Sequence, residues 1–288
     1  MGNKLSVVYA TRDEEKHIGN SIQTVKDIAD ELIVVDEYST DKTVEIVKNL
    51  GVRLVEEPHH PIFHITKQKA IDLATGDWIL QLDADERVTP ELAKEIKLVI
   101  GMTNQEREDH QQKLLDQKLF IRHKKLLEER DGRIGNEEGE YVAYLIPRRN
   151  FFLGKYLKYG GTYPDGVIRL FKKGRAYLPC KSVHEQYVVE GRVGWLQGHL
   201  LHMADTSFRH YLMRNNRYIN LIVDEMKTNE LKIDLVKSID YLVVKPIYWF
   251  LLTQIRHKGV WDGWQGIAFS FFSALRFPRA YIRYIMKK

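Results

Sequence analysis

The stretch Trp78-Ile79-Leu80-Gln81-Leu82-Asp83-Ala84-Asp85-Glu86 decides the fold class of this chain. It is a short apolar run, free of glycine and proline, that ends in two aspartates separated by one residue. Such a run is typical of a strand that is buried on both faces of a sheet. Ionised carboxylates are costly to bury unless they are paired or bind a cation. The pattern therefore predicts a parallel strand whose carboxyl end opens on a ligand-binding crevice.

The residues before this stretch alternate between strand and helix patterns. Strands are expected at residues 5–10, 32–35 and 52–55. Between them, helical spacing of apolar residues is seen in Ile18, Ile22, Val25 and Ile28, in Val44 and Val47, and in Ala70 and Leu73. This rhythm indicates a parallel sheet covered by helices on both faces. The expected fold class is α/β, with a Rossmann-like, mostly parallel sheet flanked by helices.

The composition changes twice further along the chain. Residues 102–140 are dense in charged side chains, and we expect one or two surface helices there with a thin apolar stripe of Leu115, Leu119 and Leu126. Strand patterns return from residue 141, and a long helix is expected over residues 206–227. We therefore predict one domain over residues 1–205, with halves 1–101 and 141–205 around the insertion 102–140. A helical region over 206–288 follows it.

The C-terminal tail combines aromatic and basic residues. From Tyr241 onward, tryptophan and phenylalanine alternate with lysine and arginine, and Asp262 is the only acid. Basic amphipathic helices with aromatic residues lie in membrane interfaces. We expect residues 206–288 to be an amphipathic extension that associates with an anionic membrane surface, and the alternative is an aromatic cap on the core. Nucleic acid is not expected as a partner, because no DNA- or RNA-binding motif accompanies these residues.

The composition and the apolar runs of the sequence indicate the cellular compartment of the protein. The 288 residues carry a formal net charge of +5 and a single cysteine, Cys180. One cysteine excludes an intrachain disulfide and fits a reducing compartment. The apolar run at residues 5–10 is too short for a signal peptide, and no run reaches the roughly 18 residues that a membrane span needs. The expected location is cytoplasmic, peripheral on the inner face of the cell membrane.

Acidic residues follow three of the expected strands, namely Asp13 with Glu14, Asp36, and Asp83 with Asp85. Because the carboxyl ends of parallel strands meet at one edge of a sheet, these carboxylates are expected to lie together. In an extended turn, Asp83 and Asp85 can reach one metal ion from the same side. Such oxygen donors suit Mg²⁺ or Mn²⁺ carrying a phosphate-bearing substrate. The sequence predicts an enzyme that acts on a nucleotide or another diphosphate.

The whole pattern resembles family 2 glycosyltransferases of the GT-A fold. The matching segments come in the family's order, at residues 7–15, 33–41, 76–86, 165–171 and 183–185. Residues 147–151 and 160–165 are most similar to the lipopolysaccharide-core β-glucosyltransferase type. The resemblance implies a GT-A domain over 1–205, with a nucleotide-sugar half at 1–101 and an acceptor half at 141–205.

The resemblance also implies roles for individual residues. Thr11, Asp13 and Glu14 would lie beside the base and ribose, and Asp36 would hydrogen-bond the base edge. Lys67 and Gln68 would reach the diphosphate. Asp83 would contact the ribose or the water shell of the metal, and Asp85 would ligate the metal. His184 is the first candidate to complete the metal shell, and His202 is the second.

Transfer with inversion needs a carboxylate that takes the proton of the acceptor hydroxyl. Many relatives use a Glu-Asp pair upstream of an Arg-Leu strand, and here that place holds only Pro164-Asp165. Asp165 is therefore the first candidate for the base, and Glu185 is the second.

The implied function is metal-dependent, inverting transfer of a hexose, with glucose as the first candidate. The donor would be a nucleotide sugar, UDP-linked by preference, and the acceptor a lipid-linked or lipopolysaccharide-type cell-envelope glycan. One alternative is a polyprenyl-phosphate glycosyltransferase, and another is a non-catalytic membrane-bound scaffold with this fold. A nucleotidyltransferase or a dinucleotide dehydrogenase would want a glycine-rich loop where Thr11-Arg12-Asp13 stands.

Overall fold

The computed structural model describes residues 2–181 and 186–286, and the chain divides into two compact units. We call Met1–Arg148 with Pro164–His202 the N-terminal unit, and Arg149–Tyr163 with Met203–Lys288 the C-terminal unit. We predicted a boundary after residue 205, and the C-terminal unit resumes at Met203. Residues 149–163 group with the C-terminal helices, however, because Phe152 packs edge-to-face on Tyr211 and Phe269.

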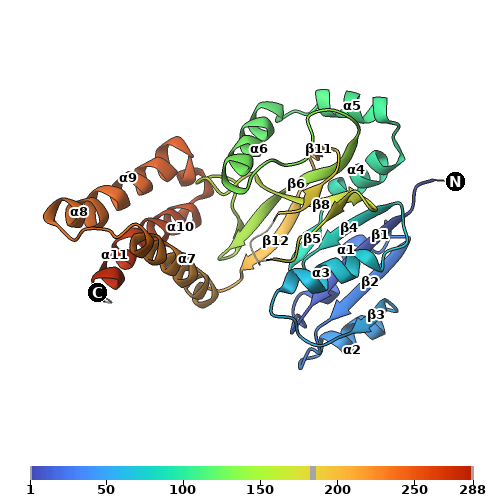
Figure 1. The fold of residues 1–288 in the computed structure, drawn as a ribbon, viewed down its shortest axis with the longest axis horizontal. Helices are drawn as coiled ribbons and strands as arrows, with labels where there is room; N and C mark the ends of the chain where they lie inside the picture. Colours follow the sequence, from blue (N-terminus) through green and yellow to red (C-terminus); the bar gives the residue numbers. More distant parts are fainter. Residues whose placement is uncertain (1, 182–185, 287–288) are drawn as a thin grey trace. The chain divides into compact units, whose positions relative to one another are not determined.

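The N-terminal unit is built around a sheet with the strand order β3-β2-β1-β4-β8-β6-β12-β5 (Figure 1). Its first four strands pair in parallel, with β1 between β2 and β4. The bounds of these four are β1 Leu5–Thr11, β2 Glu31–Asp36, β3 Arg53–Glu56 and β4 Trp78–Leu82. Every residue of β1 and of β4 is buried, as near-continuous apolar runs in a covered parallel sheet require.

The other side of the sheet is mostly antiparallel, and its exception is β11, which pairs in parallel with β6. β8 pairs with β4 and β6, and β12 pairs with β5. The strands there are β5 Glu86–Val88, β6 Tyr141–Phe152, β7 Lys155–Tyr156, β8 Asp165–Lys172, β11 Arg192–Trp195 and β12 Leu200–Asp205. β9 Ala176–Tyr177 and β10 Val188–Val189 form a separate two-stranded sheet. The result is the expected α/β fold with a mostly parallel sheet in its first hundred residues.

Helices cover both faces of this sheet. One apolar cluster contains the α1 residues Ile18, Ile22 and Val25 together with Leu92 and Ile96 of α4. A second cluster, on the α3 and α6 side, contains Ala70, Ile71, Phe120 and Leu127. The helices are α1 Ile18–Val25, α2 Thr43–Asn49, α3 Phe63–Asp72, α4 Pro90–Gly101, α5 Asn104–Gln112 and α6 Gln117–Asp131.

The charged insertion forms two helices, α5 and α6, as expected, but the predicted apolar stripe was wrong by one residue. Leu115, Leu119 and Leu126 are 89%, 37% and 52% exposed. The neighbouring residues Leu114, Phe120 and Leu127 are buried instead. The aromatic ring of Phe120 stacks on Trp195 with 4.5 Å between the ring centroids, and this contact fixes the rotation of α6.

The C-terminal unit is helical. Its first helix matches the predicted span within two residues, and it packs against the last helix through Ile219, Val223, Ala280 and Tyr281. The elements are α7 Phe208–Thr228, α8 Leu235–Ile239, η1 Asp240–Val244, α9 Lys245–Leu251, η2 Leu252–Arg256, η3 Gly259–Asp262, α10 Trp264–Ala274 and α11 Arg276–Met286. Within the described residues, none of the helices combines the length and the apolar character needed to cross a membrane.

Candidate active site

The predicted acids gather at the carboxyl edge of the parallel strands. Glu14 follows β1, and Asp83 and Asp85 follow β4, its neighbour in the sheet. Burial raises the pKa of Glu14 from 4.5 to about 7, and the negative charges of Asp85 and Asp83 add to this effect. These three carboxylates are therefore close enough to repel one another.

The loops after β1 and β2 are joined by hydrogen bonds between the predicted nucleotide-contacting residues. Asp36 is fully buried, and its carboxylate accepts bonds from Thr11 Oγ1 at 2.8 Å and from Ser39 N at 2.7 Å. Asp13 lies at φ 56°, in the left-handed region that aspartate tolerates, and accepts a bond from Thr40 N at 2.7 Å. Asp36 and Asp13 thus hold the two loops in one conformation beside the acidic edge.

Asp83 is surrounded by cations. Lys67 Nζ on α3 lies 2.5 Å from its Oδ1, and Arg169 on β8 contacts its Oδ2. Burial by itself would raise the pKa of Asp83, but the charges of Arg169 and Lys67 outweigh it and hold the pKa well below its ordinary value. Asp83 is therefore ionised, and its charge is already compensated by the protein.

A chain of buried ion pairs runs from Asp83 to the candidate base. Arg169 donates to Glu86 Oε1 at 2.9 Å, and Arg148 Nη1 donates to the same oxygen at 3.2 Å. Arg148 also donates through Nη2 to Oδ2 of Asp165 at 2.8 Å. Glu86 is fully buried, and such a carboxylate is tolerated only with partners of this kind. Asp165, at the start of β8, is thereby oriented by Arg148.

Asp85 pairs with a histidine. His202 Nε2 lies 3.2 Å from Asp85 Oδ2. Burial would raise the pKa of Asp85, but the hydrogen bond and charge of His202 lower it below its ordinary value. The pairing arises because β12 runs antiparallel to β5, with His202 opposite Glu86 in the register. His202 was the second histidine candidate in the sequence; His184, the first, and Glu185 lie outside the described residues.

Gln68, which was expected to reach a diphosphate, has protein partners for both amide atoms. Its Oε1 accepts a bond from Leu178 N at 2.7 Å, and its Nε2 donates to Asp72 Oδ1 at 2.7 Å. Lys67, its neighbour on α3, instead points to the acidic edge through its pair with Asp83. Of the two residues, Lys67 is the one that the structure brings to the site.

The side chains at the acidic edge suit a metal ion whose remaining ligands come from the substrate. Among the described residues, no group of three or more histidine, cysteine, aspartate or glutamate side chains is arranged to hold a metal. Asp85 and His202 supply one carboxylate and one imidazole, with Glu14 nearby. Mg²⁺ is commonly bound by only one or two carboxylates together with substrate phosphates and water. The residues present therefore fit a divalent ion that arrives with a diphosphate.

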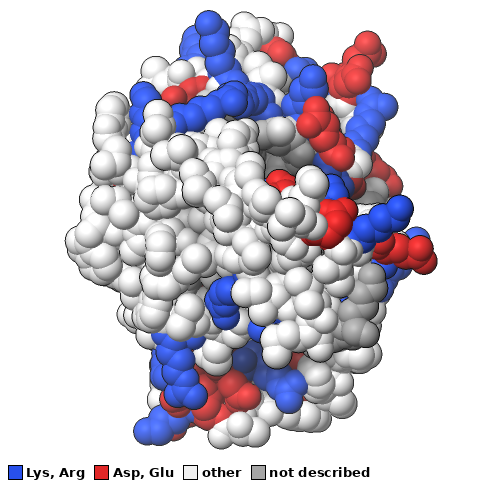
Figure 2. All heavy atoms as spheres, turned by 90° about the vertical axis from the view of Figure 1, so that its left-hand side faces the viewer, with Lys and Arg blue, Asp and Glu red and all other residues white. Residues whose placement is uncertain are grey.

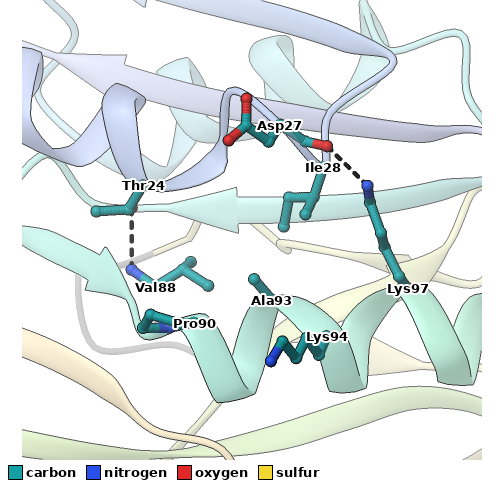
Figure 3. Close-up of a pocket in the computed structure, with 8 residues that line it drawn as sticks. All are labelled: Thr24, Asp27, Ile28, Val88, Pro90, Ala93, Lys94 and Lys97. Atoms are coloured by element: carbon teal, nitrogen blue, oxygen red, sulfur yellow. Dashed lines mark hydrogen bonds between the residues drawn. The ribbon is translucent and has the colours of Figure 1, made fainter.

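A hollow lies on the N-terminal unit between α1 and α4 (Figure 3). Lys97 Nζ crosses it to the Asp27 carbonyl oxygen at 2.7 Å, and Thr24 Oγ1 accepts a bond from Val88 N. Its lining is Thr24, Asp27, Ile28, Val88, Pro90, Ala93, Lys94 and Lys97. None of the predicted site residues lines this hollow, so it is separate from the acidic edge.

The geometry defines a class of protein. The Rossmann-like parallel half, the mostly antiparallel second half and the carboxylates after β1 and β4 agree with the GT-A fold that the sequence resembles. Residues 6–101 match the model of the glycosyl transferase family 2. These residues form a family 2 glycosyl transferase domain, and relatives that match most of the chain are glycosyltransferases.

Two relatives match most of the chain. An uncharacterized glycosyltransferase of Rickettsia typhi is 28% identical over 262 residues, which cover 86% of this chain and 75% of that protein. The lipopolysaccharide core biosynthesis glycosyltransferase LpsC of Rhizobium meliloti is 25% identical, over 89% of this chain and 82% of that protein. Glucosyl-3-phosphoglycerate synthase from Mycobacterium tuberculosis, solved with Mn²⁺ and UDP, matches only 30% of this chain and 34% of its own, at 28% identity and a TM-score of 0.28.

Proposed function

We propose that this enzyme transfers a hexose, glucose in the first place, from a UDP-linked donor with inversion at the anomeric carbon. The acceptor is a lipid-linked or lipopolysaccharide-type glycan of the cell envelope. The similarity to LpsC over most of both chains supports the acceptor class. The enzyme would work as a peripheral protein on the inner face of the cell membrane, where such acceptors are assembled.

One observation carries the donor half of the proposal, namely the uneven compensation of the clustered acids. Asp83 has two cationic partners, Lys67 and Arg169. Glu14 has a raised pKa because burial and the charges of Asp85 and Asp83 disfavour its ionised form. A divalent cation is therefore attracted to the side of Asp85 and Glu14 and not to Asp83.

We assign the residues accordingly. Asp85 and His202 would hold Mg²⁺ or Mn²⁺, which when bound offsets charge on the departing diphosphate. Asp83, kept ionised by Arg169 and Lys67, accepts a hydrogen bond from a ribose hydroxyl. The nucleobase of the donor lies beside the loops that Asp36 and Asp13 organise. The Lys67 side chain supplies positive charge next to the diphosphate of the donor.

On the acceptor side, Asp165 is the proposed general base. Its carboxylate is 36% exposed, which leaves it within reach of a substrate, and Arg148 fixes its orientation by donating two bonds to Oδ2. A carboxylate positioned in this way takes the proton of the acceptor hydroxyl as the oxygen attacks the anomeric carbon. Glu185 remains the second candidate.

The test is transfer and slow hydrolysis of UDP-glucose with Mn²⁺ or Mg²⁺. The product should have the inverted anomeric configuration. Asp165→Asn, which keeps an oxygen for Arg148 but cannot take a proton, should lower turnover by about a hundredfold or more with the donor KM unchanged. A loss confined to Glu185→Gln would move the base there.

Two further outcomes would change the proposal. Full activity in both variants with a polyprenyl-phosphate acceptor would favour the phosphate-acceptor enzyme, since a phosphate needs little help from a base. Absence of hydrolysis with every nucleotide sugar and metal tried would favour a scaffold.

A further inference from the structure

The C-terminal unit contains helices that expose apolar side chains and bury polar ones. α8, η1 and α9 have no buried residue, whereas Thr253 and Gln254 of η2 and Ser270 and Ser273 of α10 are buried. On these elements and on η3, the apolar residues exposed by 60% or more are Leu235, Val236, Tyr248, Ile255, Trp261 and Trp264. Phe269 and Phe272 of α10 pack on the core around Phe152, but elsewhere on these elements the arrangement is the reverse of a helix that packs its apolar face against a core in water.

Polar contacts hold these helices together. Gln254 Nε2 donates to Ser270 Oγ at 2.6 Å, and Trp249 Nε1 donates to Ser273 Oγ at 3.0 Å. The backbones also approach so closely that a Cβ atom on Gly266 would overlap the carbonyl oxygen of Gly259. Small residues at the contact and side-chain hydrogen bonds between helices are the means by which helices associate when their surroundings are lipid.

The outward residues form continuous stripes. From Leu235 to Arg256 the elements α8, η1, α9 and η2 follow one another, and each junction residue has helical backbone angles. Along this run Ile247, Leu251 and Ile255 recur every four residues and are 54%, 47% and 72% exposed. On α10, the exposed residues Trp264, Ile267 and Phe271 likewise share one face.

The charges beside these stripes are mostly basic, and the one acid in the run from Leu235 to Arg256, Asp240, pairs with Lys245 Nζ at 3.3 Å. Asp262 is the only acid after residue 240, and it is buried, where its Oδ2 accepts bonds from Lys158 N and Tyr159 N. Arg256 and Lys258 are exposed, and Lys258 Nζ lies 4.7 Å from the ring centre of Trp261. Figure 2 shows a broad, mostly uncharged surface, with charged side chains of both signs along its upper, right-hand and lower margins.

We infer that the surface formed by α8, η1, α9, η2, η3 and α10 inserts into one leaflet of an anionic membrane without crossing it. The outward aliphatic residues enter the acyl region, Trp261 and Trp264 lie at the headgroup level, and Arg256 and Lys258 face anionic headgroups. A protein partner would explain an exposed apolar patch, but not the polar contacts inside the helix pair. The inference rests on the membrane setting proposed above, and it uses none of the donor or metal assignments.

The experiment measures flotation of the full chain with vesicles of phosphatidylcholine, with and without phosphatidylglycerol. Wild type should bind the anionic vesicles, and brominated lipids should quench its tryptophan fluorescence. Ile247→Ser/Leu251→Ser should weaken binding to both kinds of vesicle about tenfold or more. Arg256→Glu/Lys258→Glu should remove the preference for anionic lipid.

Matched controls lie in the N-terminal unit. Leu115→Ser replaces a leucine that is 89% exposed, and Lys118→Glu reverses an exposed lysine, so neither should change binding. Equal binding by wild type and both double variants, or no binding by wild type to either kind of vesicle, would overturn the inference. A stable dimer in solution that is broken by Ile247→Ser/Leu251→Ser would also overturn it, in favour of a second copy. Stabilisation by UDP with Mn²⁺, measured on the same variants, shows separately whether the donor proposal stands.

Discussion

Removal of Arg169 is the perturbation that most sharply tests the buried ion-pair chain. The guanidinium is 6% exposed and pairs with both Asp83 and Glu86, of which Glu86 is fully buried. Arg169→Met keeps most of the side-chain volume but leaves two carboxylates without this partner. Breaking a buried ion pair by removing one member costs about 3–5 kcal/mol, because the remaining charge is uncompensated. For a protein of this size, that loss lowers Tm by about 6–20 °C.

The pH dependence gives the prediction a sign. In wild type the pKa of Asp83 is held below its ordinary value, so the stabilisation that its ionisation contributes is present at neutral pH and is lost as pH falls through the folded-state pKa. Without Arg169 the folded-state pKa of Asp83 rises, so the variant binds protons that wild type does not. The stability deficit of Arg169→Met should therefore shrink as pH falls through the raised folded-state pKa of Asp83 in the variant.

Urea unfolding followed by circular dichroism measures both quantities. Arg53→Met is the matched control, because the Arg53 side chain is 50% exposed and its pair with Glu31 spans 3.5 Å. Its loss should cost under about 1 kcal/mol. A deficit of that small size in Arg169→Met, or one that does not change with pH, would refute the ion-pair account.

Three further predictions concern individual residues of the N-terminal unit. Thr11→Val removes the 2.8 Å bond to buried Asp36 and should cost about 1–3 kcal/mol in urea unfolding, whereas no loss would mean that this bond does not hold the loop. Gly166→Ala places a Cβ against the Trp195 ring and should lower stability by about 1–3 kcal/mol in the same assay; a neutral result would mean that the ring yields easily. Because the pKa of Glu14 is raised from 4.5 to about 7, metal-free protein should lose stability as pH rises across that window, and Glu14→Gln should flatten the thermal-shift profile; an unchanged profile would contradict the crowding of acids.

Local sequence patterns were enough to predict the parallel half of the fold. The run Trp78–Leu82 is a fully buried strand, and Asp85 follows it at the edge where the acids gather. These elements are short-range: each is specified by consecutive apolar residues and by the turn that ends them. Rotation of α6 was not predictable in this way, because it depends on the contact of Phe120 with Trp195, which is distant in sequence.

The charge partners of the site could not be predicted for the same reason. Arg169 reaches Asp83 only because β8 pairs with β4 across 86 residues of sequence separation. His202 reaches Asp85 only because β12 lies beside β5. Antiparallel pairing after a long insertion leaves no local pattern in the sequence, so Arg148, Arg169 and Glu86 were seen only as parts of motifs.

The polar contacts between the C-terminal helices could not be predicted from the sequence either. Aromatic and basic residues in the tail suggested a membrane surface, but the inward direction of Gln254, Ser270 and Ser273 depends on how α10 packs on η2 and α9. Glycine and serine at those places look unremarkable in a sequence. Their role becomes visible only when the contacts of each helix face are known.

The most direct test of the donor site is calorimetric titration of UDP into wild type, Asp85→Asn and Asp83→Asn, each with Mn²⁺ and with chelator. We expect Mn²⁺ to strengthen UDP binding to wild type and to Asp83→Asn, and Asp85→Asn to lose about tenfold or more of this metal-dependent gain. Asp83→Asn should bind UDP more weakly with and without metal. Metal dependence that is lost in Asp83→Asn but kept in Asp85→Asn, or equal UDP affinity of wild type with and without Mn²⁺, would contradict the assignment.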